Sequence, residues 1–338
     1  MSARSSITTL PPVLGLVLAV AAVVAVIVSA FTWANVRSEP HELPIAVAAP
    51  APLAEQVSTQ LVESAGREAF EISTVADRAA AVDLVQDREV YGAVVVGQEG
   101  GEILTASAAS PAVAQMLTQL AAGVPPQAGG PFRVTDVVPL PSDDPRGIGL
   151  SAGLLPLVIA GILTAALLAT LVGTVGLRVV GVALAAATGG MATVGVLQGW
   201  LGSLEGSYWA NSAVAALAIG AVGATLLGLY RLLGRPGLGL GAATMVLLGN
   251  PLSAAGSAPE MLPEGWGTLG QLLPPGAAGT ALRSVAFFDG AGATVPLIVL
   301  TSWLVVGLVL AMLPVHRGEN GARAARDGQS AASQPVPA

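Results

Sequence analysis

The side chains that could bind a ligand lie within or beside long apolar segments. Gln198 and Asn250 are the polar groups deepest in those segments, Pro251 follows Asn250, and Arg283 lies in a more polar stretch beyond them. An amide in a membrane helix commonly hydrogen-bonds neighbouring backbone, and it can also contact a substrate. We therefore take Asn250, Pro251, Gln198 and Arg283 as candidates for a substrate path or for its structural support.

Three arginines form a second group of candidates. Arg178, Arg231 and Arg235 lie in short segments between apolar stretches. Basic residues in short loops set the orientation of membrane helices, and this is the first role that we assign to them. The same three side chains are also candidates for contact with a partner protein in the cytoplasm.

No group of residues has the composition of a catalytic, cofactor or metal site. The chain has no cysteine, and His41 has no second ligand at metal spacing. Ser107 and Ser110 have no histidine nearby that could act as a base. No GxxxxGK[ST] segment occurs, so an ATP-driven step would need another subunit to bind the nucleotide. We predict that the chain is not an enzyme and uses no cofactor.

The elements that hold these residues have the composition of an integral membrane protein. Of 338 residues, 53% are hydrophobic and only 10% are charged, and the mean hydropathy is +0.73. This balance predicts the lipid bilayer as a partner. The net charge of −7 argues against nucleic acid as another.

Six segments are apolar enough to be transmembrane helices, for which roughly 20 residues are needed. They cover residues 13–33, 148–177, 179–201, 213–229, 238–249 and 293–313. The first exceeds the apolar core of a cleaved signal peptide, so we predict a retained anchor. The fifth is only about 18 Å long, and we expect it to continue past Asn250 and Pro251 as a kinked or broken helix. None of the six contains an ionisable side chain, which argues against a proton-coupled carrier.

Residues 35–147 differ from the rest because helical and strand patterns alternate there. Their predicted order, βαβαββαβ, is that of one compact α/β domain. Asp77 is placed to cap a helix over 78–86, and Gly100-Gly101 predicts a hairpin. The strands are predicted at 43–48, 69–75, 91–96, 102–106 and 132–139, and the other helices at 53–64 and 111–120. Without a catalytic group, this domain is best interpreted as a binding or assembly module.

The stretch 250–289 is too rich in proline and glycine to cross a bilayer as one helix. Its apolar residues form two patches, one at 269–273 and one at helical spacing over 278–288. We predict two short amphipathic helices, re-entrant or interfacial, within 251–292 at the outer membrane surface. Non-helical backbone at that depth needs protein or water to satisfy its polar groups.

Charge predicts the orientation of the chain. Arginines are concentrated in the segments that would be cytoplasmic if the N-terminus is inside, which satisfies the positive-inside rule. We therefore predict a polytopic α-helical protein of the plasma membrane with six transmembrane helices, both termini in the cytoplasm and one α/β extracytoplasmic domain between helices 1 and 2. The predicted parts are 1–34 (N-terminus and first helix), 35–147 (outer domain), 148–315 (five-helix membrane domain) and 316–338 (disordered cytoplasmic tail).

The last third carries a resemblance to a known family. Its residues run Gly256, Pro259, Met261-Leu262-Pro263, Trp266, Pro274-Pro275 and Leu282-Arg283. Together with 91–96 and 105–110, this pattern resembles ABC-2-type membrane proteins, in the actinobacterial permease-like group related to the YhgE/Pip (phage infection protein) family. The resemblance implies an exporter subunit for amphiphilic or cell-envelope molecules. It would work as a homodimer with a separate ATP-binding cassette subunit, for which Arg178, Arg231 and Arg235 are candidate contacts.

One alternative function stays open. ABC-2 exporters usually have an interface helix before the first span and a coupling helix between the second and third. Here about a dozen residues precede the first span, and the second connection is nearly bare around Arg178. The chain could instead be a non-transporting envelope scaffold or receptor whose outer domain binds a partner.

Overall fold

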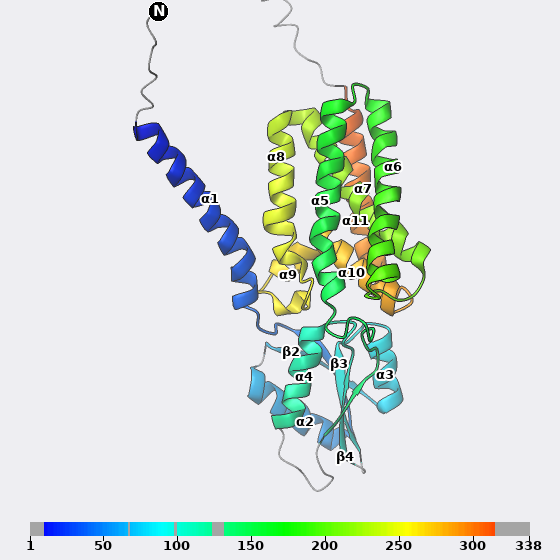
Figure 1. Cartoon of the computed structure of the whole chain (residues 1–338). Helices are drawn as coiled ribbons and strands as arrows, with labels where there is room; N and C mark the ends of the chain where they lie inside the picture. The colour runs from blue at the N-terminus through cyan, green and yellow to red at the C-terminus, as the bar shows by residue number, and fades with distance from the viewer. Residues whose placement is uncertain (1–9, 67, 98–99, 124–131, 315–338) are drawn as a thin grey trace, which may run out of the picture.

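The computed structural model describes residues 10–66, 68–97, 100–123 and 132–314. It consists of a helix bundle and an α/β domain that lies against one end of the bundle (Figure 1). The first helix leans away from the bundle on one side. The predicted tail 316–338 lies outside the described residues.

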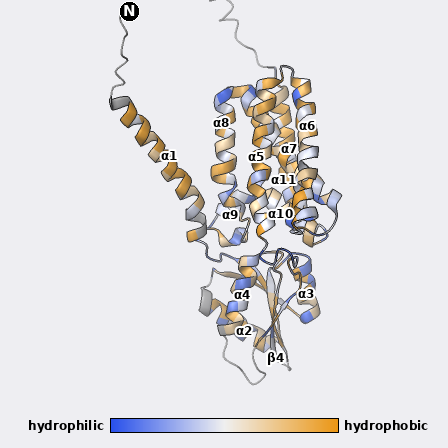
Figure 2. Cartoon of the chain, viewed as in Figure 1, coloured by the Kyte–Doolittle hydropathy of each residue, from blue (hydrophilic) through white to orange (hydrophobic). Residues whose placement is uncertain are grey.

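Five of the described helices are long and apolar enough to cross a membrane. The chain is therefore a membrane protein, and Figure 2 shows that apolar residues cover these helices. They are α1 (Leu10–Val36), α5 (Ile148–Leu171), α6 (Val175–Val194, continued by a π-helical turn over Gly195–Trp200), α7 (Tyr208–Leu233) and α11 (Thr294–Met312).

The segment predicted as the fifth span differs from the prediction. Helix α8 (Arg235–Ala243) begins three residues earlier than expected, and α7 continues to Leu233. Only Gly234, at φ 70°, separates the two helices. A π-helical turn (Thr244–Gly249) follows, and the helix is broken at Asn250 and Pro251, as predicted. The next three residues, Pro251–Ser253, form a 3₁₀ turn. At 1.5 Å per residue the regular part is about 22 Å long, which is shorter than a hydrocarbon core of about 30 Å.

Helix α7 is the centre of the bundle, and small residues let its neighbours approach closely. A Cβ added at Gly190 of α6 would lie 2.6 Å from the backbone of α7 at Ala216. One added at Gly307 of α11 would lie 2.4 Å from the amide nitrogen of Thr225. Glycine at these contacts therefore allows backbone-to-backbone packing, as is common between membrane helices.

Helix α1 makes little contact with the bundle. Its apolar segment has no residue buried inside the molecule. Near its C-terminal end the ring of Trp33 packs edge-on against that of Trp266, with centroids 5.2 Å apart. Beyond Val36 the chain runs directly into the α/β domain.

The α/β domain has the predicted order of elements. Its five strands form one sheet in the order β2-β1-β3-β4-β5, in which β3 and β4 are antiparallel and the other neighbours are parallel. The strands are β1 (Leu43–Ala48), β2 (Phe70–Val75), β3 (Gly92–Gly97), β4 (Gly100–Thr105) and β5 (Arg133–Asp136). Helix α3 (Arg78–Gln86) packs on one face, whereas α2 (Ala51–Ala65) and α4 (Pro111–Gly123) pack on the other.

Two local predictions in this domain have different outcomes. Asp77 caps α3 as predicted, because its carboxylate accepts a hydrogen bond of 2.9 Å from the amide of Ala80. The hairpin of β3 and β4 is also confirmed, but Gly100 and Gly101 lie within β4 and not in the turn. The reason at Gly101 is packing: a Cβ there would lie 2.3 Å from the ring of Phe132.

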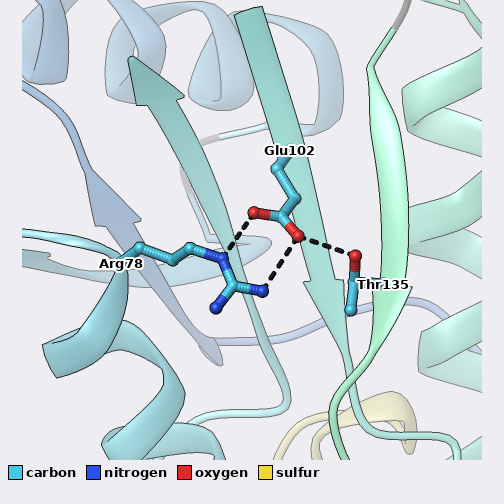
Figure 3. A network of polar contacts seen from close by, with 3 residues as sticks. All are labelled: Arg78, Glu102 and Thr135. Atoms are coloured by element: carbon cyan, nitrogen blue, oxygen red, sulfur yellow. Dashed lines mark hydrogen bonds and ion pairs between the residues drawn. The ribbon is translucent and has the colours of Figure 1, made fainter. Parts of the chain in front are cut away.

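A polar network joins the start of α3 to the sheet (Figure 3). The Arg78 guanidinium donates to both carboxylate oxygens of Glu102, at 2.7 and 3.0 Å, and the Thr135 hydroxyl donates to the same carboxylate at 2.6 Å. These hydrogen bonds, chiefly the one from Arg78, lower the pKa of Glu102. The network ties three elements together, namely α3, β4 and β5.

Two short helices lie between the bundle and the domain, α9 (Trp266–Gln271) and α10 (Pro274–Phe287) (Figure 1). Both helices were predicted, but α10 does not expose its polar residues at the surface of the protein. Its apolar face and the residues opposite, including Arg283 and Ser284, are buried against other parts of the protein. The apolar patch at 269–273 is instead partly exposed, with Leu272 54% accessible.

Candidate functional site

A cavity of about 590 Å³ lies where the α/β domain meets α9, α10 and the start of α11. Its walls come from the connector before β1, from β2, from the turn between α3 and β3, and from the segment 259–296. Its volume is in the range of small-molecule pockets, about 300–1,000 Å³. Neither the domain nor the bundle encloses this space alone.

Hydrogen bonds from the domain hold the segment before α9 against it. The amide of His41 donates to the carbonyl of Glu260 at 2.8 Å, and the Tyr91 hydroxyl donates to the Glu260 carboxylate at 2.8 Å. Burial raises the pKa of Tyr91, and the nearby Glu260 charge raises it further. The tyrosine therefore stays protonated and keeps its role as a donor. Because of these bonds, Glu260 is fixed to the domain on one wall of the cavity.

Arg88 reaches from the domain to α10. Its guanidinium donates to the carbonyl of Thr280 at 3.3 Å and to the hydroxyl of Ser284, and it lies over the ring of Phe288 at 5.1 Å. Burial lowers the pKa of Arg88, although the charge of Glu260 partly offsets this. The residue thus joins two parts of the chain that are almost two hundred positions apart.

The backbone at Arg88 explains how the side chain reaches that position. Helix α3 ends in a Schellman motif, in which the amide of Glu89 bonds to the carbonyl of Leu84 and that of Arg88 bonds to Val85. Arg88 occupies the left-handed position of the motif, with φ 61°, where glycine is usual. For a residue with a side chain this conformation costs about 1–2 kcal/mol. The turn directs the chain from α3 into β3 and presents Arg88 to the bundle.

Arg283 lies in the middle of α10, and its side chain lines the cavity. It is only 6% exposed, and it donates to the carbonyl of Ala255 at 2.8 Å. Burial, together with the positive charge of Arg88, lowers its pKa to about 10. A guanidinium carries five N–H donors, so most of those of Arg283 have no protein partner among the described residues.

Carboxylates are distributed differently from the two arginines. Glu42, Glu71 and Glu264 line the cavity and are exposed, whereas Glu260 is half-buried and bonded to Tyr91. Within the described part of the chain, no carboxylate forms an ion pair with Arg88 or Arg283. The cavity therefore has two cations on its buried wall, three acids at its exposed edge and a fourth acid, Glu260, bonded to Tyr91.

The other predicted site residues do not join Arg283 at this cavity. The carbonyl of Asn250 accepts a hydrogen bond of 2.6 Å from the Ser253 hydroxyl, and Pro251 opens that 3₁₀ turn. Gln198 donates to the carbonyl of Gly206 at 2.9 Å and accepts from Asn211 at 3.0 Å. These three residues support turns at the ends of helices, and none of them lines the cavity.

The three candidate partner contacts are grouped at the end of the bundle away from the domain. Arg178 donates to the carbonyls of Ala169 and Val172 at the end of α5, at 3.1 and 2.8 Å, and its guanidinium lies over the ring of Tyr230 at 5.5 Å. Arg231 donates to the carbonyl of Leu313 at 3.0 Å. A cation at the C-terminus of a helix satisfies free carbonyls there. Arg235 is exposed at the start of α8 and remains available at the surface.

Sequence reasoning missed Arg88, Tyr91 and Glu260. Arg88 lies in a turn, Tyr91 directly before β3, and Glu260 in a 3₁₀ turn (Pro259–Met261), and no spacing in the sequence connects them. Their proximity depends on how the domain docks against the bundle. The described part of the chain contains no group of three His, Cys, Asp or Glu side chains that could hold a metal ion. The cavity can bind a ligand by charge, but the residues described there do not include a nucleophile paired with a base.

Comparisons with protein-family models, with characterised proteins and with solved structures found no match to this chain.

Proposed function

We propose that the protein is a permease-like membrane subunit of an ABC-2-type exporter, which moves an amphiphilic or cell-envelope molecule outward across the plasma membrane with a separate ATP-binding subunit. In this proposal all six apolar segments cross the membrane, both termini are cytoplasmic and the α/β domain is outside. The short helices α9 and α10 then lie at the outer end of the bundle. The protein works as a homodimer.

The observation that carries this proposal is the cavity between the α/β domain and α9, α10 and α11. An exporter must release its substrate at the outer boundary of the membrane, where a polar headgroup can leave the bundle while its apolar part is still in lipid. The cavity adjoins the first turn of α11, of which Val295 is 68% exposed, and it also has charged walls. A site with both properties suits an amphiphile.

The distribution of arginines supports the proposed orientation. Arg178 lies in the first turn of α6, Arg231 in the last turn of α7 and Arg235 at the start of α8. Figure 1 shows these helix ends on the side of the bundle opposite the α/β domain. Basic residues in short loops favour the cytoplasmic side, whereas long translocated domains follow this rule weakly. The α/β domain is then on the outer side.

Copurification and ATP hydrolysis test this function. The tagged full chain is purified from its native membrane, and an accompanying subunit with a P-loop is sought. The complex is reconstituted in liposomes, where we expect ATP hydrolysis that requires this chain. The change Arg235→Glu should weaken the complex, whereas Arg146→Glu, an exposed arginine near the domain, should not. ATP hydrolysis that is independent of the chain, or the absence of any such complex, would contradict the exporter function.

A second function is favoured by the opposite end of the bundle. There α5 and α6 are joined by residues 172–174, and α7 and α8 by Gly234 alone. Neither connection contains a helix on which an ATPase could dock. If no ATP-binding subunit copurifies, the same cavity would belong to a non-transporting receptor or scaffold whose outer domain holds its ligand or partner.

A further inference from the structure

Two arginines, Arg88 and Arg283, lie on the buried wall of the cavity, and each has guanidinium N–H groups without a protein acceptor among the described residues. Arg283 is 6% exposed and has a single hydrogen-bond partner among the described residues, the carbonyl of Ala255. Arg88, half-buried on the other side, binds the hydroxyl of Ser284 and the carbonyl of Thr280, which are neutral. The nearby Glu260 is bonded to Tyr91 and offsets the charge of Arg88 only in part. Two like charges without an ion-pair partner are unfavourable in a desolvated site. A bound oxyanion would neutralise them, and the planar guanidinium matches the oxygens of a phosphate group.

The exposed edge of the cavity has the opposite charge. Glu42, Glu71 and Glu264 lie there with accessible carboxylates. A simple anion would be repelled by these groups as it enters, so they argue against a site for free phosphate. A ligand with a phosphate at its inner end and an ammonium group at its outer end complements both walls.

The surroundings of the cavity point to the membrane boundary. Val295 and Pro296, in the first turn of the apolar helix α11, form part of its wall. Close by, Trp33 at the end of α1 packs on Trp266 at the start of α9. Tryptophans are enriched where the hydrocarbon core meets the headgroups. In the proposed orientation, the cavity therefore lies at the depth at which a phospholipid carries its phosphate.

We propose that this cavity binds the zwitterionic headgroup of an amine-bearing phospholipid, with the phosphate on Arg88 and Arg283 and the ammonium group at Glu42, Glu71 and Glu264. The inference rests on the proposed function in that it names the class of molecule which the exporter or receptor handles. The shared chemistry, a phosphate next to an ammonium, also occurs in soluble headgroups. The experiment must therefore separate lipid from free headgroup.

Binding to the full chain in nanodiscs tests the proposal without ATP or any partner. The membranes are phosphatidylcholine alone, or phosphatidylcholine with either phosphatidylethanolamine or phosphatidylglycerol, and the soluble probes are glycerophosphoethanolamine and inorganic phosphate. Lipid bound to the protein is measured by native mass spectrometry, and the soluble probes by calorimetry. We expect retention of phosphatidylethanolamine over phosphatidylglycerol, weaker binding of glycerophosphoethanolamine, and no binding of inorganic phosphate.

Substitutions separate the two charged walls. Arg283→Gln and Arg88→Gln should each weaken binding of phosphatidylethanolamine about 10- to 100-fold, as for loss of hydrogen bonds to a charged group. Glu71→Gln with Glu264→Gln should reduce the preference for ethanolamine over glycerol headgroups while leaving phosphate recognition in place. Arg146→Gln removes an exposed arginine outside the cavity and should change neither property.

Every outcome decides the proposal. Equal retention of all three lipids, or wild-type binding by both arginine variants, overturns it. Binding of inorganic phosphate as tight as that of the headgroups would also overturn it, because the carboxylates would then have no role. If Arg283→Gln does not fold, the pair of exposed glutamates, whose substitution leaves the core intact, gives the answer. Selective binding without ATP-dependent export would contradict the exporter function but not the site.

Discussion

The conformation of Arg88 allows its backbone and its side chain to be tested separately. We compare Arg88→Ala with Arg88→Gly in the full chain. Both variants lose the contacts with Thr280, Ser284 and Phe288. They differ in the cost of the left-handed backbone at φ 61°, which alanine bears and glycine does not. The glycine variant should therefore be more stable than the alanine variant by about 1 kcal/mol. At positions with ordinary helical φ the order is the reverse, because glycine is there less stable than alanine.

Stability is measured by denaturant-induced unfolding in detergent, followed by tryptophan fluorescence. Ligand binding is measured on the same samples. We expect the two variants to show equal losses of phosphatidylethanolamine binding, because the guanidinium is absent from both. Their difference in stability should persist with and without lipid.

Two results would refute this reasoning. Equal stability of the variants, or greater stability of Arg88→Ala, would mean that residue 88 is not in the left-handed conformation. Wild-type lipid binding by either variant would mean that the guanidinium of Arg88 does not reach the ligand. Because the first result concerns the turn and the second concerns the cavity, they can be told apart.

Three further predictions concern the bundle and the α/β domain. Gly307→Ala should lower the free energy of unfolding by about 1–3 kcal/mol, because the added Cβ would lie 2.4 Å from the backbone of α7. Gly239→Ala has open space around it and should raise the free energy of unfolding by about 0.5–1 kcal/mol. Denaturation in detergent measures both changes. Asp77→Ala should cost about 1 kcal/mol through loss of the cap of α3, and Asp77→Asn should restore most of it in the same assay. The pKa of Glu102 is lowered in the folded state, so its carboxylate stabilises the protein at pH values above its usual pKa of 4.5. This contribution is lost as the pH falls through the lowered pKa. Glu102→Gln should reduce the slope of stability against pH in that acidic range, and an unchanged slope would contradict the network in Figure 3.

Much of the fold follows from local patterns in the sequence. The α/β domain could be predicted because each element has its own signal, such as Asp77 before α3 or the alternation of residues in β2. All five helices with spanning length were predicted, but with different accuracy. The predicted ends of α1 and α11 lie within three residues of the observed ones, whereas α6 begins four residues earlier than predicted. Helix α5 was predicted six residues too long, and α7 was predicted nine residues too short. The start of α8 could not be predicted, because a run of apolar residues gives no register and Gly234 interrupts the helix at a single position.

The candidate site was predictable only in part. Arg283 was identified because a charged residue stands out among the apolar ones of α10. Arg88 gave no such signal, since a charged residue in a turn after a helix is ordinary. Its burial arises from docking of the domain on α10, which brings it to Ser284. Contacts between distant segments depend on the assembled fold, and a single sequence does not specify them by spacing.

The position of α1 links the cavity to the thickness of the bilayer. Its apolar segment of 21 residues is about 32 Å long, close to a hydrocarbon core of about 30 Å. Such a helix stands more upright in a thick membrane and leans further in a thin one. The chain leaving α1 reaches His41, whose amide is bonded to Glu260 in the wall of the cavity. A change in lipid chain length would thus act on that wall through a covalent connection only a few residues long.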